Sequence, residues 1–434
     1  MKKLISVTLA AVLTLTMFSG CAKKSPKSSQ ASDGKASLTF AWWGNQTRND
    51  RTQKLIQQYE KNNPNVTITA QFTDWNSYWN KLATQEAANS TPDIIQMDYA
   101  YINQYVSKHL LLDMTPYTKN GIFETTNIPK DVLASGTLNS KLYAISIGSN
   151  VLCLVYDPAI VEKAGLSDIS NNWSWDDFDN YVNTIYQKTK IPSEPLFFTD
   201  GTQWIEYVAR ENGFSYYSKD GKSLGFKDSK IMTDVYNRLL THTKDGSFVS
   251  PDKVASVTTP EQNPIVSGSA WLSSCWSNQF VALANASKRT LKLINMPLSK
   301  SDKEMGLYNK PGQFLSVSAS TKYKDASMKF VNYFENSEEA NDILLGERGV
   351  PTNTKIAEAI KSKVDTYTAA TFDYVNTVNS KKLVSTIDPP YPSASNQVGT
   401  ISKQFYDKVA YQKEAPSQAA SEFMQQANAA LSSQ

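Results

Sequence analysis

The chain has 434 residues, with 44 Lys or Arg against 41 Asp or Glu, and its formal net charge is +3. A balance so close to neutral excludes a strongly basic nucleic-acid-binding surface, so no nucleic-acid partner is predicted. Only 2 histidines and 3 cysteines are present, which argues against a zinc site built from these residue types.

The amino-terminal segment predicts export and membrane anchoring. Two lysines precede an apolar run over residues 4–18, and two small residues lead to Cys21. This order is typical of a secretory signal, and the run is shorter than the roughly 20 residues of a spanning helix. We expect residues 1–20 to be a signal peptide and Cys21 to carry two acyl chains, as in bacterial lipoproteins. Residues 21–36, rich in Ser and Lys, are expected to be a flexible tether. A cleaved signal with an incidental cysteine is the alternative.

Beyond the tether, segments with the spacing of strands alternate with segments with the spacing of helices. Residues 66–72 alternate apolar and polar side chains, and residues 75–83 repeat every three to four positions. In chain order, strands are predicted over 38–43, 66–72, 93–97, 141–147, 151–156 and 314–317, and helices over 47–62, 75–83, 99–108, 158–164, 175–188, 231–243, 326–336 and from 400 onward. This alternation indicates an α/β fold with a largely parallel sheet, and the length indicates two lobes.

No sequence motif of a common enzyme class is present. His109 and His242 are isolated, and HExxH, CxxC, GxSxG, P-loop and GxGxxG motifs do not occur. Carboxylates such as Asp93 and Asp98 could meet in the fold, but this spacing is more typical of helix caps and exposed faces. The sequence therefore predicts a protein that is not an enzyme, with no cofactor, bound metal or catalytic residue.

Cys153 and Cys275 each lie in an apolar run, VLCLV and LSSCW. Because an unpaired cysteine behaves as a small apolar residue, two buried free thiols are expected. Two cysteines in an exported protein can also pair, so a disulfide between them is the alternative.

Aromatic residues are abundant, with 9 Trp and 22 Tyr. A Trp or Tyr ring offers a flat apolar face beside a polar group, which suits sugar rings with C–H groups on one face and hydroxyls at the edge. Asn, Gln, Asp and Arg side chains can then bind the hydroxyls. Segments that combine these residue types begin at Trp42, Asp74, Gln96 and Trp271.

Some of these positions are expected to face a ligand. Trp43 points away from the apolar residues of its strand and lies at the carboxyl end, where open α/β sheets bind ligands. Asp98 ends another strand in the same way, and Trp276 followed by Asn278 is a third such position. Trp75 shares a helical stripe that is mostly core, so at most one residue of that stripe is expected to reach a ligand.

Arg48 and Arg51 lie in the first turns of a predicted helix, where the helix dipole disfavours cations. Positive charge there suits an anionic ligand group, since arginine binds carboxylates through two parallel hydrogen bonds. Asp50 lies between them, and an internal ion pair with this residue is the alternative.

Eight segments resemble, in order, those of family 1 extracellular solute-binding proteins of ABC sugar importers: LTFAWWGNQTRND (38–50), YEKNNPNV (59–66), TPDIIQMDY (91–99), KLYAI (141–145), VEKAGL (161–166), IVSGSA (265–270), KFVNYF (329–334) and GERGVPTN (346–353). The set spans essentially the whole chain after the tether. The WWGN, DWN, QMD, GERGVP and DPP stretches look closest to members linked to pectin-derived oligosaccharides, particularly rhamnogalacturonan fragments. Such fragments carry uronic acids, which would suit the two arginines.

This resemblance implies a two-lobed periplasmic-binding-protein-like fold (type II), with a ligand cleft between lobes joined by a hinge. The amino-terminal lobe would hold 37–150 and 308–348, and the carboxy-terminal lobe 151–307 and 349–434. Ligand binding would close the lobes, and the closed monomer would dock on ABC permease subunits at the extracellular face of the cell membrane. The ligand contacts implied by position are Trp43, Asn45, Arg48, Trp75, Asp98, Asn150, Trp276, Asn278 and Tyr391.

Two other kinds of function stay open from the sequence. A surface polysaccharide lyase or hydrolase could share aromatic sugar subsites, provided that a carboxylate pair meets in the cleft. A binding protein for another solute, such as a peptide, or an adhesin could share the same export signal.

Overall fold

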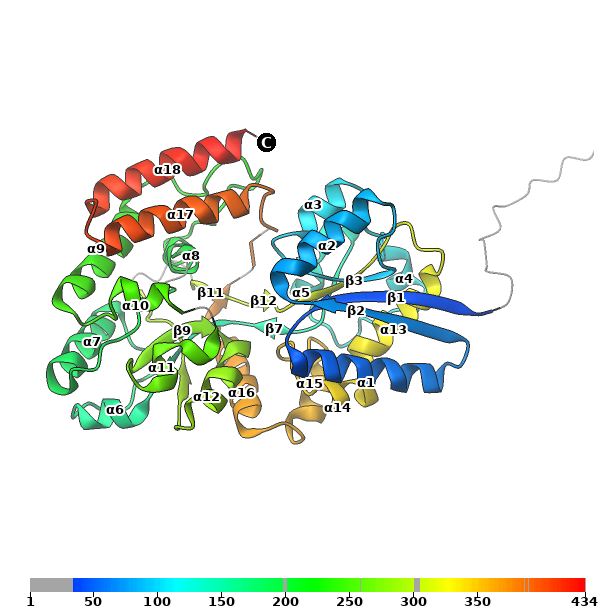
Figure 1. Cartoon of the computed structure of the whole chain (residues 1–434), viewed down its shortest axis with the longest axis horizontal. Coiled ribbons are helices and arrows are strands. Elements are labelled where there is room, and N and C mark those ends of the chain that lie inside the picture. The colour runs from blue at the N-terminus through cyan, green and yellow to red at the C-terminus, as the bar shows by residue number, and fades with distance from the viewer. Residues whose placement is uncertain are drawn as a thin grey trace, which may run out of the picture.

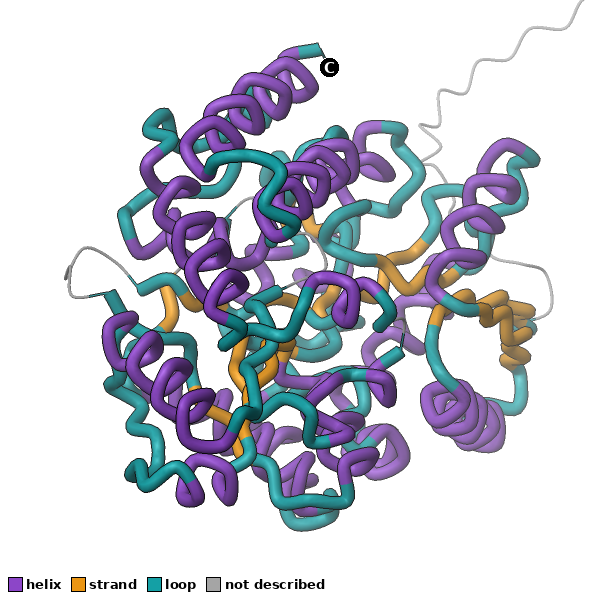
Figure 2. The backbone as a smooth tube through the Cα atoms, turned by 60° about the vertical axis from the view of Figure 1, so that its left-hand side comes forward, coloured by secondary structure: helices purple, strands orange, loops and turns teal. Residues whose placement is uncertain are grey.

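The computed structural model describes residues 34–197, 201–257, 259–299, 305–385, 387–388 and 390–433. Within these ranges the chain forms two α/β lobes side by side, joined by strands that cross between them (Figure 1). Turned by 60°, the molecule shows helices flanking the strands (Figure 2). The predicted two-lobed α/β fold is confirmed.

The predicted signal peptide (1–20), the predicted lipidation site Cys21 and the tether as far as residue 33 lie outside the described residues. The first strand begins at Ala36, the last residue assigned to the tether. Among the helices that the structure describes, none combines the length and the apolar character needed to cross a membrane.

The first lobe is built on a five-stranded mixed sheet in the order β2-β1-β3-β13-β6. β1 pairs in parallel with β2 and β3, whereas β13 runs antiparallel to β3 and β6. The strands are β1 (Ala36–Trp43), β2 (Val66–Thr73), β3 (Ile94–Met97), β6 (Ile145–Ser146) and β13 (Phe314–Val317). The helices are α1 (Gln46–Asn62), α2 (Trp75–Ala87), α3 (Ile102–Ser107), α4 (Thr115–Lys119), α5 (Lys130–Ser135), α13 (Lys324–Asn336) and α14 (Glu338–Leu344).

The alternation of β1 places its side chains in separate cores on the two faces of this sheet. Trp42 lies in a core formed with α1, α13 and α14, whereas Trp43 lies in a second core formed with α2 and α3. α1 begins directly after β1 because the side chain of Asn45 accepts a hydrogen bond of 3.0 Å from the main-chain N–H of Arg48. The strand and the helix that follows it thus hold residues 43–48 at the carboxyl end of β1.

The second lobe has a three-stranded antiparallel sheet in the order β10-β8-β9. The strands are β8 (Leu152–Tyr156), β9 (Leu272–Trp276) and β10 (Lys292–Ile294). The helices of the rest of the chain are α6 (Pro158–Lys163), α7 (Trp175–Thr189), α8 (Thr202–Glu211), α9 (Lys230–Asp245), α10 (Pro251–Ala255), α11 (Pro264–Ser267), α12 (Phe280–Ser287), α15 (Thr354–Lys361), α16 (Thr366–Ser380), α17 (Ser395–Ala410) and α18 (Pro416–Ser432). The short strands are β4 (Thr137–Leu138), β5 (Lys141–Leu142), β7 (Ser149–Asn150), β11 (Leu307–Tyr308), β12 (Lys310–Pro311) and β14 (Val384–Ser385).

The prediction of a largely parallel sheet is wrong. The first sheet mixes both pairings, and the second is antiparallel throughout its described strands. All five residues of β8 are buried, and a continuous apolar run indicates a strand buried on both faces without revealing the direction of its neighbours. Strand direction depends on connections that the local pattern does not contain.

Cys153 and Cys275 face each other across β8 and β9. Their Sγ atoms lie 3.6 Å apart, and both thiols are free and buried. The predicted pair of buried free thiols is confirmed, and burial raises the pKa of the Cys153 thiol well above its ordinary value.

The crossing between the lobes is a layer of closely packed backbone. β7 pairs antiparallel with β12, and the N–H of Ser149 donates a hydrogen bond of 2.8 Å to the carbonyl of Val350. A Cβ at Gly312 would lie 2.4 Å from the main-chain oxygen of Arg348, and one at Gly148 would lie 2.6 Å from the same atom. Only glycine allows the three segments to approach so closely.

Candidate functional site

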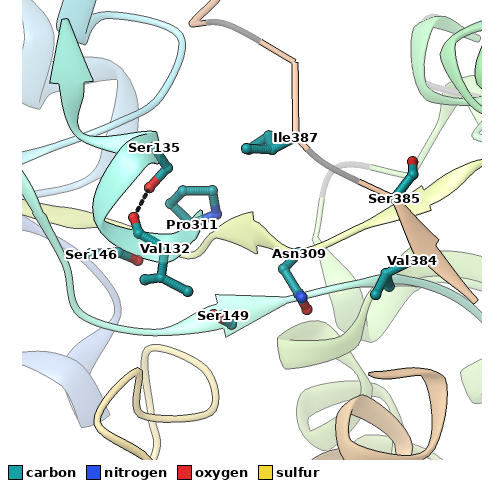
Figure 3. Close-up of a pocket in the computed structure, with 9 residues that line it drawn as sticks. All are labelled: Val132, Ser135, Ser146, Ser149, Asn309, Pro311, Val384, Ser385 and Ile387. Carbon is teal, nitrogen blue, oxygen red and sulfur yellow. Dashed lines mark hydrogen bonds between the residues drawn. The ribbon is translucent and has the colours of Figure 1, made fainter. Parts of the chain in front are cut away.

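Two cavities lie between the lobes, and we call them together the interlobe cleft. The first, of about 200 Å³, is bounded by α5, the crossing strands and β14 (Figure 3). Its lining includes Val132, Ser135, Ser149, Pro311, Ser385 and Ile387. The second, of about 430 Å³, has a lining that includes Leu138, Asn139, Tyr216, Lys222, Asp388 and Tyr391. The segment between α16 and α17 contributes to both cavities and is therefore their common wall.

An aromatic cluster forms part of the first lobe beside this cleft. Trp43 is only 7% exposed, and its ring centroid lies 5.0 Å from that of Trp75 and 5.5 Å from that of Trp79. Trp79 in turn stacks on Tyr101 at 3.7 Å, and a side-chain hydrogen bond joins Tyr101 to Asn396 of α17 in the other lobe. Trp75 is 40% exposed. Trp43 is therefore mainly a core residue, and Trp75 presents the free aromatic surface.

Arg210 of α8 is buried behind the common wall of the two cavities. Its Nη1 lies 2.8 Å from Oδ2 of Asp388, and its Nη2 donates a hydrogen bond of 2.6 Å to Oγ of Ser385. Its guanidinium lies over the ring of Tyr308, 4.7 Å from the centroid. Ser385 lines the first cavity and Asp388 lines the second, so the guanidinium of Arg210 contacts one lining residue of each cavity.

Glu206 lies one helical turn before Arg210 and is also buried. The hydroxyl of Tyr391 donates to it at 3.0 Å and the hydroxyl of Tyr308 at 3.2 Å. Burial raises the pKa of Glu206 to about 7, although the positive charge of Arg210 acts in the opposite direction. Tyr391, predicted as a ligand contact, is thus tied into a polar cluster at the cleft.

Trp276 lies at the end of β9 and is half-buried. Nζ of Lys310, on the crossing strand β12, lies 4.7 Å from the centroid of its ring, and the rings of Trp276 and Tyr308 pack edge to face with centroids 5.9 Å apart. Asn278, in the following turn, is half-buried as well. Tyr308 therefore links Trp276 to the Tyr391 cluster, because the Tyr308 and Tyr391 hydroxyls are 3.5 Å apart.

Arg48 belongs to a buried ion cluster. It is 8% exposed, and its Nε donates to both carboxylate oxygens of Glu347, at 3.0 and 2.9 Å. Its Nη1 donates at 3.1 Å to the carbonyl of Trp43. The alternative partner considered for Arg48, Asp50, instead accepts a hydrogen bond from Gln46, so that expectation is wrong. Arg48 needs a carboxylate, and a residue 299 positions away in the chain provides it.

Three other predicted contacts have structural roles in this structure. Asn45 caps α1. Oδ1 of Asp98 accepts the N–H of Ala100 at 2.9 Å, which shapes the turn after β3. Asn150 is 3% exposed and lies against the crossing glycines, since a Cβ at Gly349 would come within 2.8 Å of its Oδ1.

Among the described residues, no group of three or more His, Cys, Asp and Glu side chains could hold a metal ion. Residues 43–341 match the family model described as bacterial extracellular solute-binding protein, which is well over half of the chain. The chain belongs to this family. The predicted resemblance is therefore confirmed at the level of the family.

The relatives of this solute-binding protein extend the likeness to sequence and shape. A stretch of 145 residues is 23% identical to a binding protein of Brucella abortus (strain 2308), and it covers 33% of this chain and 34% of that protein. The chain thus spans about a third of the length of the curated relatives that it matches. A family 1 extracellular solute-binding protein of Alicyclobacillus acidocaldarius superposes with a TM-score of 0.74 and 29% identity, covering 93% of this chain and 100% of that one.

Two further solved structures share the fold. One is an oligogalacturonide-binding protein of Yersinia enterocolitica in complex with saturated digalacturonic acid, with a TM-score of 0.76, 20% identity and coverage of 92% and 99%. The other is an ABC substrate-binding protein of Listeria monocytogenes in complex with cycloalternan, with a TM-score of 0.77, 18% identity and coverage of 91% and 98%.

Sequence reasoning missed the charged residues of this solute-binding protein's cleft. Glu206 and Arg210 lie four residues apart in the otherwise largely apolar stretch WIEYVAR, and this spacing on a buried helix face was the available signal. Asp388 precedes a Pro-Pro pair and has no comparable signal, because its partners come from distant parts of the chain.

Proposed function

We propose that this protein is the solute-capturing component of an ABC importer, which binds an oligosaccharide outside the cell and delivers it to a permease. The observation that carries the proposal is the interlobe cleft, whose cavities are lined by residues of both lobes, with Tyr216, Tyr217 and Tyr391 in the wall of the second. Such a site suits a ligand with apolar ring faces and hydroxyl edges, which fixed polar groups orient. Two proteins of the same fold were solved with oligosaccharides.

We further propose an acidic, pectin-derived oligosaccharide as the ligand, and binding without catalysis. Lipid attachment at Cys21 would hold the monomer at the outer face of the cell membrane, beside the permease. The hinge would separate an amino-terminal lobe of 37–150 and 308–348 from a carboxy-terminal lobe of 151–307 and 349–434. The family match and the paired crossing strands support this arrangement.

Titration calorimetry of the mature protein tests the proposal. A panel should contain digalacturonate, its dimethyl ester, neutral oligosaccharides and short peptides. We expect a saccharide to bind with a Kd of about 1 µM or tighter, which corresponds to about −8 kcal/mol. New reducing ends in the same mixtures would reveal a lyase or hydrolase, and binding of peptides alone would contradict the proposal.

Removal of the ring of Trp75 or of Trp276 should weaken saccharide binding without unfolding the protein. We expect Trp75→Ala and Trp276→Ala each to cost about 1–3 kcal/mol of binding free energy, the amount typical of one buried ring face. Calorimetry of each variant measures the change, and circular dichroism verifies folding.

Phe72→Ala is the matched control for these two variants. Phe72 is also exposed, at 37%, but it stacks on Trp42 on the opposite face of the first sheet. Its removal should leave saccharide affinity unchanged. Equal losses in all three variants would mean that the rings act through stability and do not contact the ligand.

A further inference from the structure

Asp388 receives polar contacts from both lobes. Arg210 of α8 pairs with its side-chain carboxylate at 2.8 Å. From the first lobe, the hydroxyl of Tyr99, just beyond β3, donates a hydrogen bond to its main-chain carbonyl. A residue that bridges the lobes through a carboxylate and a carbonyl makes the set of contacts expected of a ligand in the same cleft.

The surroundings of Arg210 suit an acidic sugar better than those of Arg48. Arg48 is held by Glu347 within the first lobe, whereas Arg210 touches lining residues of both cavities. The ring of Tyr308 lies under the Arg210 guanidinium and helps to hold it in place beside Ser385 and Asp388.

Charge decides whether a ligand carboxylate would join Asp388 or replace it. Arg210 already pairs with Asp388 and lies one helical turn from Glu206, so a third acidic group at this guanidinium would have no positive partner of its own. Exchange of one carboxylate for another keeps the charge of the cluster constant and keeps the buried guanidinium paired. A neutral sugar could not make this exchange.

We propose that Asp388 occupies the carboxylate subsite of the interlobe cleft, and that the carboxylate of an acidic oligosaccharide replaces it on Arg210. This inference rests on the proposed function and names its ligand class. Asp388 then acts as a built-in competitor, which a uronate displaces and a neutral oligosaccharide does not.

The test compares digalacturonate with its neutral dimethyl ester by titration calorimetry, on the full mature protein. Arg210→Gln should weaken digalacturonate binding by about 10- to 100-fold, the loss of a charge-assisted hydrogen-bond pair, and should change ester binding by less than about twofold. Asp388→Asn should do the opposite and tighten digalacturonate binding by roughly 3- to 10-fold, because the competing charge is gone. Arg210→Lys keeps the positive charge and replaces Arg210→Gln in this comparison if Arg210→Gln does not fold.

Arg238 and Asp179 provide a matched control pair. Arg238 pairs with Asp179 at 2.8 Å and lies 4.6 Å from the centroid of Trp175, but neither residue lines the two cavities. Arg238→Gln and Asp179→Asn should leave both dissociation constants within about twofold of the unmodified protein.

Any of three results would overturn the inference while leaving the proposed function intact. The first is unchanged or weaker digalacturonate binding in Asp388→Asn. The second is preference of the unmodified protein for the ester, and the third is equal loss of affinity for both ligands in Arg210→Gln. If the unmodified protein binds no saccharide at all, the proposed function fails and this inference fails with it.

Discussion

Glu347→Gln is expected to lower the free energy of unfolding by about 3–5 kcal/mol, the usual effect of removing one partner of a buried ion pair. The Glu347 carboxylate accepts two hydrogen bonds from Arg48 and lies 3.5 Å from Nη1 of Arg348. Both guanidinium groups are buried. Without the carboxylate, two positive charges would face each other in the interior of the protein.

The pKa values of Glu347 and Arg348 support this expected loss of stability. Burial alone would raise the pKa of Glu347, but the charges of Arg48 and Arg348 hold it below its ordinary value. Burial lowers the pKa of Arg348 to about 9, and the charge of Arg48 contributes to the same decrease. The carboxylate is therefore the group that makes two buried arginines tolerable.

Urea unfolding at pH 7 measures the effect, with Glu338→Gln as the control. Glu338, in α14, is largely exposed and pairs with Lys363 at 3.0 Å, so its replacement should cost less than about 1 kcal/mol. Similar losses in the two variants would show that Glu347 contributes no more than a surface ion pair. The crossing backbone should also loosen, since the carbonyl of Arg348 packs against Gly148 and Gly312.

Local patterns in the sequence predicted the strands of the first sheet, but only β8 among the strands of the second. The two-residue alternation of β1 correctly separated Trp42 from Trp43, and the predicted helix over 47–62 matches α1 within one residue at its start. These successes share a physical origin, because side-chain periodicity reports which face of an element is buried.

The parts that local patterns did not predict depend on contacts between distant residues. Arg48 and Glu347 are 299 positions apart, and no neighbour of Arg48 in the sequence indicates its partner. The same holds for Arg210 and Asp388, and for Asn150, which lies against Gly312 and Gly349 of two other crossing segments. Polar residues at strand ends are predicted to face a ligand, and two of them, Asn45 and Asp98, also form the helix cap and the turn at those ends.

Buried glutamates should make the protein more stable in mild acid than in mild alkali. Burial raises the pKa of Glu194 and of Glu335 to about 8, and those of Glu206 and Glu211 to about 7. Because these values exceed the ordinary 4.5 for the unfolded chain, the folded state retains protons that the unfolded state has released. The free energy of unfolding should therefore fall as pH rises from about 5 to 8.

Glu335 allows this dependence to be assigned to one residue. Its Oε1 accepts a hydrogen bond of 2.5 Å from the Thr352 hydroxyl and another of 3.1 Å from the N–H of Asn353, just beyond the crossing segment. At 1.36 kcal/mol per pKa unit, its share of the decrease between pH 5.5 and 8 is about 3 kcal/mol as an upper bound. Glu335→Gln keeps the acceptor oxygen and removes the titration.

We therefore expect the stability of Glu335→Gln, measured by urea unfolding at pH 5.5 and pH 8, to differ less between the two conditions than that of the unmodified protein. Glu358→Gln, at an exposed position of α15, should leave the difference unchanged. A carboxylate ionised throughout this range would give the same pH dependence in both variants. Glu335 accepts the hydrogen bond of Thr352, two residues after Val350, which pairs with Ser149 between the crossing segments. If Glu335 is protonated in the folded protein, its proton uptake therefore stabilises the packing of these crossing segments.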